Sequence, residues 1–371
     1  MTGTATLVRS ALGVGLLLLP AIVADAVPGA PWTWLLCCVL GMLTGYAVAT
    51  ARRAPPSRLP AVRAWYLGGT AVGQGFICWT ASAYAGGALG WGRLPVFVLA
   101  VALLAVCLFV AYRGWGDSAR FRHLRLGATL AVAVMWLCRP GALRAGADVL
   151  GPAPGVLGAV FLVLISVVGW ESTRGALGEP GPGSGWRAAG QVAVAGTVVV
   201  ALTAGFTALR LLHSDPAPGS PPERVVLSLL VFVLAGSYCV SNLRVAGRLL
   251  DEFVRPVAAG MGPGTCWVAL TAAAAMAWAL VTGNGTWQLL LGPGSMTWAI
   301  LALYTGRVLI DRTSPLPARM AAAAAGAVLC AVAVPMWPAL LFPASAALLA
   351  VASTRVSAVR RRRHEKVGTG G

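Results

Sequence analysis

A succession of long apolar runs, separated by short breaks that often carry arginine, constrains this chain more than any other feature. A helix needs about 20 apolar residues to cross a hydrocarbon core about 30 Å thick. Backbone groups in lipid must pair internally, and these runs are far longer than barrel strands. The sequence therefore predicts an all-α integral membrane protein with about twelve transmembrane helices. The apolar runs are 7–27, 32–51, 64–90, 94–112, 124–147, 154–179, 187–211, 224–249, 264–283, 287–309, 317–335 and 337–355.

Composition supports lipid as the surroundings of nearly the whole chain. Of its 371 residues, 58% are hydrophobic and only 11% are charged. The mean hydropathy is +0.79, a value that no water-soluble domain of ordinary composition reaches. Little sequence remains for a soluble domain once the runs are assigned to membrane spans.

The positions of the basic residues predict orientation. The net charge is +17, but the sequence contains no folded polar domain that could contact bases in a groove of DNA or RNA. We therefore expect no nucleic-acid partner. With the N-terminus inside, all but five of the 28 lysines and arginines fall on the cytoplasmic side. We therefore expect both termini in the cytoplasm and the protein in the inner (plasma) membrane. The alternative for the run 7–27 is a cleaved signal peptide ending at Ala24–Asp25–Ala26.

The eight cysteines lie in or at the ends of apolar runs, without a C-x-x-C pair or a nearby histidine. This pattern indicates neither a disulfide framework nor a metal site, and it favours a packing role. We expect no cofactor.

Two runs contain glycine at the depth where a continuous helix would reach mid-membrane. The first break is Leu12–Leu16, ahead of Pro20, and the second is Val167–Ser172. They open the first and sixth helices, which correspond in two successive five-helix sets. An odd number of spans turns the second set upside down, so we expect the breaks to face each other, as in inverted-repeat transporters.

Broken helices expose main-chain dipoles. Free N–H groups at the start of a half-helix attract anions, and free carbonyls at the end of one attract cations. A zwitterionic amino acid fits this arrangement, with its carboxylate on the amides around Val14 and Gly15 and its ammonium on the carbonyls of 167–169. The alternative is that these glycines only allow close helix packing.

The segments Gly13–Pro20 and Phe161–Glu179 resemble the first-helix and sixth-helix signatures of the amino acid, polyamine and organocation (APC) superfamily; more weakly, Asn242–Arg248 resembles the end of its eighth helix. The resemblance implies a LeuT-like 5+5 inverted repeat plus two helices: repeats at 1–150 and 151–312, two helices at 313–356, and a basic tail at 357–371. It also implies a substrate site lined by Gly13, Val14, Gly15, Val168, Gly169 and Trp170, to which the dipole argument adds Val167.

Glu171 stands beside the second break and is predicted to carry the proton that couples transport to a proton gradient. The alternative is a helix-end acid paired with Arg174 or Arg244. The only lysine, Lys366, lies in the tail, so the lysine that some proton-coupled members carry in the fifth helix is missing.

We expect a transporter of neutral or apolar amino acids, as a monomer or homodimer, and not an enzyme. The aromatic residues considered for the pocket are Trp170, Tyr66, Phe76, Trp79 and Tyr238. The competing readings are a major-facilitator-type transporter of another small solute, a polytopic membrane enzyme and a scaffold protein.

Overall fold

The described part of the chain is entirely helical. The computed structural model describes residues 30–51, 59–114, 119–138, 155–167, 184–212, 220–254, 264–283 and 285–352, and these contain helices, turns and no strand. Every predicted run from 32–51 onward overlaps a helical segment, whereas the run 7–27 and the parts 139–147 and 168–179 of two other runs lie outside the described residues. The helices are α3 (Ala30–Thr50), α4 (Pro60–Leu89), α5 (Arg93–Tyr112), α6 (Ala119–Cys138), α8 (Val156–Val163), η2 (Leu164–Val167), α10 (Ser184–Leu212), α11 (Pro221–Val254), α12 (Gly264–Thr282), α13 (Gly285–Ile310), α14 (Leu316–Ala333) and η4 (Val334–Leu340), with a last helix at 341–352.

Within these described ranges, six helical stretches are long and apolar enough to cross a membrane. The predicted number of about twelve spans stays a prediction. The stretches are Trp32–Thr50, Arg93–Tyr112, Pro221–Asp251, Gly264–Thr282, Gly285–Ile310 and Leu316–Ala352. The last of these covers two predicted runs, which η4 joins through a kink at Met336, where φ is −116° and ψ is 20°.

Local sequence explains the tight connection between α4 and α5. Pro60 stands in the first turn of α4, where its missing N–H costs no hydrogen bond. Gly90 ends the helix with φ at +70°, a left-handed conformation that glycine adopts without strain. The N–H of Trp91 then donates to the carbonyl of Gly86 at 2.8 Å, which satisfies a helix-end acceptor.

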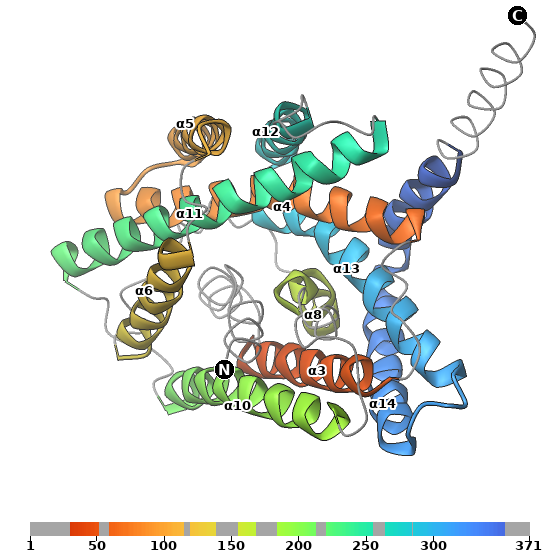
Figure 1. Cartoon of the computed structure of the whole chain (residues 1–371). Coiled ribbons are helices and arrows are strands. Elements are labelled where there is room, and N and C mark those ends of the chain that lie inside the picture. Colours follow the sequence, from red (N-terminus) through yellow and green to blue (C-terminus); the bar gives the residue numbers. More distant parts are fainter. Residues whose placement is uncertain are drawn as a thin grey trace, which may run out of the picture.

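The helices form a bundle around α8 (Figure 1). In this view α4 and α11 run side by side, with α5 and α12 on their outer side, while α3 pairs with α10 on the opposite side. The helix α13 packs against α4, α8 and α14. The segment α8–η2 thereby lies between α3 and α13, inside the ring of longer helices.

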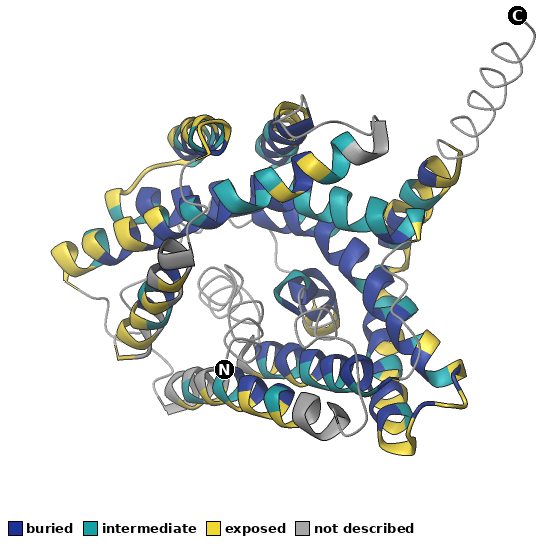
Figure 2. Ribbon diagram, in the orientation of Figure 1, coloured by how far each residue is buried: buried dark blue, intermediate teal, exposed yellow. Residues whose placement is uncertain are grey.

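Burial shows which faces meet lipid. In Figure 2, most of α8 and the middle of α4 are buried, whereas α5 and α12 carry exposed residues on their outer sides. Those exposed residues are large and apolar, including Val98 and Phe109 on α5 and Trp267 and Trp278 on α12. Such apolar outer surfaces, on helices of this length, make the chain a multi-pass membrane protein.

Candidate functional site

The segment α8–η2 changes its helix type inside a predicted span. The α-helix ends at Val163, and a 3₁₀ turn continues from Leu164 to Val167, so the change falls within the run 154–179. The hydroxyl of Ser166 donates to the carbonyl of Val163 at 2.8 Å, which binds a main-chain acceptor through a side chain. A 3₁₀ stretch in mid-helix often marks a functional hinge. This irregularity ends at Val167, the first residue of the predicted second break.

Three helices approach the segment α8–η2 closely. A β-carbon at Gly294 of α13 would lie 2.8 Å from the carbonyl oxygen of Phe161. A β-carbon at Gly73 of α4 would lie 3.2 Å from Cδ1 of Ile165. On a third side, the thiol of Cys37 in α3 lies 3.7 Å from the carbonyl of Val160. Small residues on three neighbours therefore pack against this segment, two of them on α8 and one on η2.

The helix α13 carries an interruption of its own at this contact. Pro293 stands inside α13 between two glycines and has no N–H to donate to the carbonyl of Leu289. The hydroxyls of Ser295 and Thr297 donate to the carbonyls of Gly292 and Pro293, each at 2.8 Å. The sequence analysis did not identify this site. A proline flanked by glycines in the run 287–309 was the signal that could have indicated it.

Of the predicted substrate-site residues, only Val167 lies within the described residues, where it is buried at the end of η2. The predictions for Gly13, Val14, Gly15, Val168, Gly169, Trp170 and Glu171 fall outside those residues. The predicted approach of the two breaks is therefore untested.

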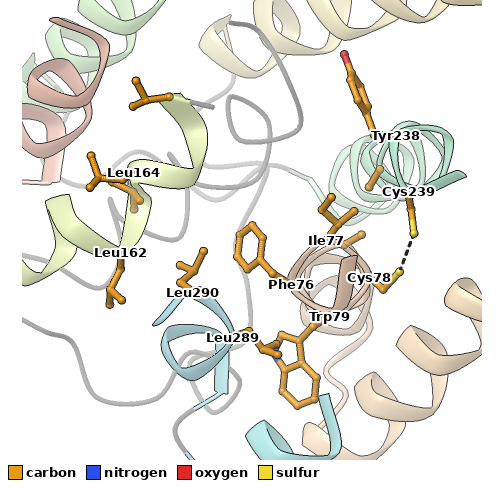
Figure 3. Close-up of a cluster of buried hydrophobic side chains, with 14 of the residues drawn as sticks. Phe76, Ile77, Cys78, Trp79, Leu162, Leu164, Tyr238, Cys239, Leu289 and Leu290 are labelled. Atoms are coloured by element: carbon orange, nitrogen blue, oxygen red, sulfur yellow. Dashed lines mark hydrogen bonds between the residues drawn. The ribbon is translucent and has the colours of Figure 1, made fainter. Parts of the chain in front are cut away.

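The aromatic residues proposed for the pocket occupy different surroundings (Figure 3). Phe76 points from α4 toward the side on which Leu164 of η2 lies, whereas Trp79 points toward Leu289 of α13. Tyr66 packs against a separate cluster that includes Tyr304. Among the residues that Figure 3 labels, Phe76 is thus the aromatic side chain directed toward η2.

Tyr238 takes part in a polar cluster between α6 and α11. The guanidinium carbon of Arg125 lies 4.4 Å from the centroid of the Tyr238 ring. The same guanidinium donates to the carbonyl of Ser237 at 2.9 Å and to the hydroxyl of Ser241 at 2.7 Å. The predicted orientation placed Arg125 with the basic residues on the cytoplasmic side, at the start of the run 124–147. Here it is buried in α6, which begins at Ala119, five residues before the predicted run.

Three buried thiols gather where α4, α5 and α11 meet. The sulfur atoms of Cys78 and Cys239 are 3.7 Å apart, as the dashed line in Figure 3 marks. The thiol of Cys107 lies 3.4 Å from the carbonyl of Gly236 and interacts with Cys239. These cysteines are free and fill the helix interface with small side chains. In the part of the chain that the structure describes, no group of three or more His, Cys, Asp or Glu side chains has an arrangement that could hold a metal ion.

Comparison with known proteins gives only remote similarity. No protein-family model matches the chain. No curated protein sequence matches it either. Among solved structures, a manganese transporter of Eremococcus coleocola in which a histidine is replaced by alanine matches with a TM-score of 0.45 and 12% identity, covering 98% of this chain and 94% of that one. A second variant of that transporter, with a glutamate replaced by alanine, matches with a TM-score of 0.46 and 13% identity over the same shares.

Proposed function

We propose that this protein is a secondary transporter that carries a small amino-acid-like solute across the membrane. The observation that carries this proposal is the change from α-helix to 3₁₀ turn at Leu164–Val167, within a predicted span and in contact with α13, the helix that contains Pro293. Irregular backbone at membrane depth is tolerated only where it is buried in protein or lines a water-filled cavity. In transporters, such irregular helices form substrate sites.

The chemistry of the proposed site follows from main-chain dipoles. A helix that unwinds after η2 leaves carbonyl groups without their usual partners, and these carry partial negative charge. They suit the ammonium group of a neutral amino acid. The amides of the predicted break around Val14 and Gly15 would bind its carboxylate, and Glu171 would carry the coupling proton. The LeuT-like inverted repeat that would bring these segments together is part of the same proposal.

Reconstitution tests the proposal. The purified protein would be placed in liposomes and supplied with a panel of labelled neutral amino acids, with and without a proton gradient; empty liposomes are the control. We expect concentrative uptake of at least one neutral amino acid under a gradient. Absence of uptake and of exchange for every amino acid would contradict the proposed substrate class. Uptake of Mn²⁺ or a sugar instead would show that the protein transports a different class of solute.

Substitution then tests whether the breaks matter. Alanine at Gly13, Gly15 or Gly169 adds a β-carbon where ligand and backbone are proposed to meet, so uptake should fall while the protein still folds. A scaffold protein, or a transporter with another site, would tolerate these changes. Alanine at Gly306 of α13 is the matched control, because no atom lies within 4 Å of a β-carbon there.

A further inference from the structure

Threonine hydroxyls in the helices of this protein follow a consistent pattern. Most of those that the structure describes donate to the carbonyl four residues earlier, at distances of 2.7 to 2.9 Å. This local bond satisfies the hydroxyl in apolar surroundings, where an unpaired polar group costs free energy. The threonines that do so are Thr50, Thr129, Thr197, Thr271, Thr282, Thr297 and Thr305.

Thr80 departs from this pattern. It lies in the interior of α4 with no exposed surface, yet its hydroxyl has no hydrogen-bond partner among the described residues. The carbonyl of Phe76, four residues earlier, is the acceptor that the other threonines would use. Buried polar groups without partners are uncommon, and each one calls for an explanation such as an absent ligand.

The helical position of Thr80 places it on the same face of α4 as residues that lie near the candidate site. Gly73, Phe76 and Thr80 are separated by three and four residues, so they share one face of α4. This face meets η2, because Gly73 contacts Ile165 and Phe76 points toward the side of Leu164 (Figure 3). Thr33 and Thr44 of α3 also have unpaired buried hydroxyls, but they share the face of Cys37, which contacts α8 before the 3₁₀ turn begins.

We propose that the hydroxyl of Thr80 is a side-chain ligand of the transported solute and donates a hydrogen bond to its carboxylate. The assignment rests on the proposed transport function and adds a side chain to a site otherwise built from main-chain groups. Carbonyls at the end of η2 attract the ammonium and repel the carboxylate, so the carboxylate needs a donor on the facing wall. A hydroxyl that makes no backbone bond can supply that donor, and a hydrogen bond to an ionised acceptor is strong.

Three variants test this role in proteoliposomes with labelled L-leucine and L-phenylalanine. Thr80→Val removes the hydroxyl and should raise KM about 10-fold or more, the effect of losing a hydrogen bond to a charged group. Thr80→Ser keeps the hydroxyl and should stay within about threefold of the wild type. Thr305→Val is the control, because Thr305 is equally buried but already bonded to the carbonyl of Leu301.

Two further readouts separate binding from packing. Without substrate, Thr80→Val should unfold at the same or a higher temperature than the wild type, because an unpaired buried hydroxyl has been replaced by a methyl group. Competition by 3-methylbutylamine, which is leucine without its carboxylate, should be weak in the wild type and relatively stronger in Thr80→Val. A purely structural role of Thr80 would not change the affinity for 3-methylbutylamine relative to the affinity for leucine.

The outcomes distinguish this inference from the function on which it rests. If the wild type takes up the amino acids and Thr80→Val has the same KM and the same relative competition by 3-methylbutylamine, the role of Thr80 is overturned. The transport function then still stands. A lower unfolding temperature with an unchanged KM would overturn the role of Thr80 too. Failure of the wild type to transport any amino acid would overturn both.

Discussion

Gly294 of α13 lies directly against the main chain of Phe161 in α8, so closely that a β-carbon on the glycine would be 2.8 Å from the phenylalanine carbonyl oxygen. The same β-carbon would lie 3.1 Å from the Cα and the carbonyl oxygen of Leu162. These neighbours are backbone atoms, which cannot turn aside as a side chain can. The close approach fixes α13 to α8 one turn before the 3₁₀ segment begins.

Alanine at Gly294 should therefore push α13 away from α8. We expect a loss of stability of about 1–3 kcal/mol, as in other overpacked interiors, together with reduced uptake. Thermal unfolding of the purified protein in detergent measures the first effect. Gly306→Ala in the same helix should leave the unfolding temperature unchanged or slightly raised, since it adds helix propensity in open space. Equal behaviour of the two variants would contradict the close packing.

The stacking of Arg125 on Tyr238 should be measurable as a coupling between the two residues. Tyr238→Leu removes the ring beneath a buried guanidinium and should cost about 1–2 kcal/mol, whereas Tyr238→Phe keeps the ring and should cost little. In an Arg125→Met background, the cost of Tyr238→Leu should shrink. A double-mutant cycle on unfolding free energies gives the coupling, and a value near zero would mean that the contact contributes nothing.

Thiol labelling should divide the cysteines into two groups. Cys138, Cys266 and Cys330 are exposed, and the remaining five are buried. In detergent, N-ethylmaleimide should add to the exposed thiols of the folded protein and reach all eight only after unfolding. Mass spectrometry of the intact and digested protein locates the adducts. Rapid labelling of Cys78 or Cys239 in the folded state would show that the interface between α4 and α11 is open.

The proposed proton-carrier role of Glu171 predicts a selective defect. Glu171→Gln cannot bind and release a proton, so uptake driven by a proton gradient should be lost while exchange of substrate across the membrane persists. Comparing the two transport modes in the same proteoliposomes measures this difference. Glu223→Gln is the control, because Glu223 is exposed at the start of α11, where it accepts the N–H of Ser220. Full gradient-driven uptake in Glu171→Gln would remove the carrier role.

The apolar runs in the sequence located most helices, because a membrane span needs one uninterrupted apolar segment. Runs such as 94–112 and 264–283 match α5 and α12 within a residue or two at each end. Two boundaries were misplaced by five residues: α6 begins at Ala119 and not at 124, and α11 ends at Val254 and not at 249. Arg125 was placed at the polar end of its span, although it is buried in α6. Hydropathy ranks a residue by its type, so it cannot recognise an arginine that Tyr238 and two serines surround.

The sequence alone determined that the chain is helical and lies in a membrane, because the length and composition of each run decide whether it can leave water. It also predicted a break at 167–172, and the 3₁₀ turn at Leu164–Val167 reaches the first residue of that segment. Only the tertiary structure decided which helices touch, since packing depends on which side chains oppose one another. The approach of Gly294 to Phe161, the stacking of Arg125 on Tyr238 and the unpaired hydroxyl of Thr80 each join or compare residues whose relationship no local pattern encodes.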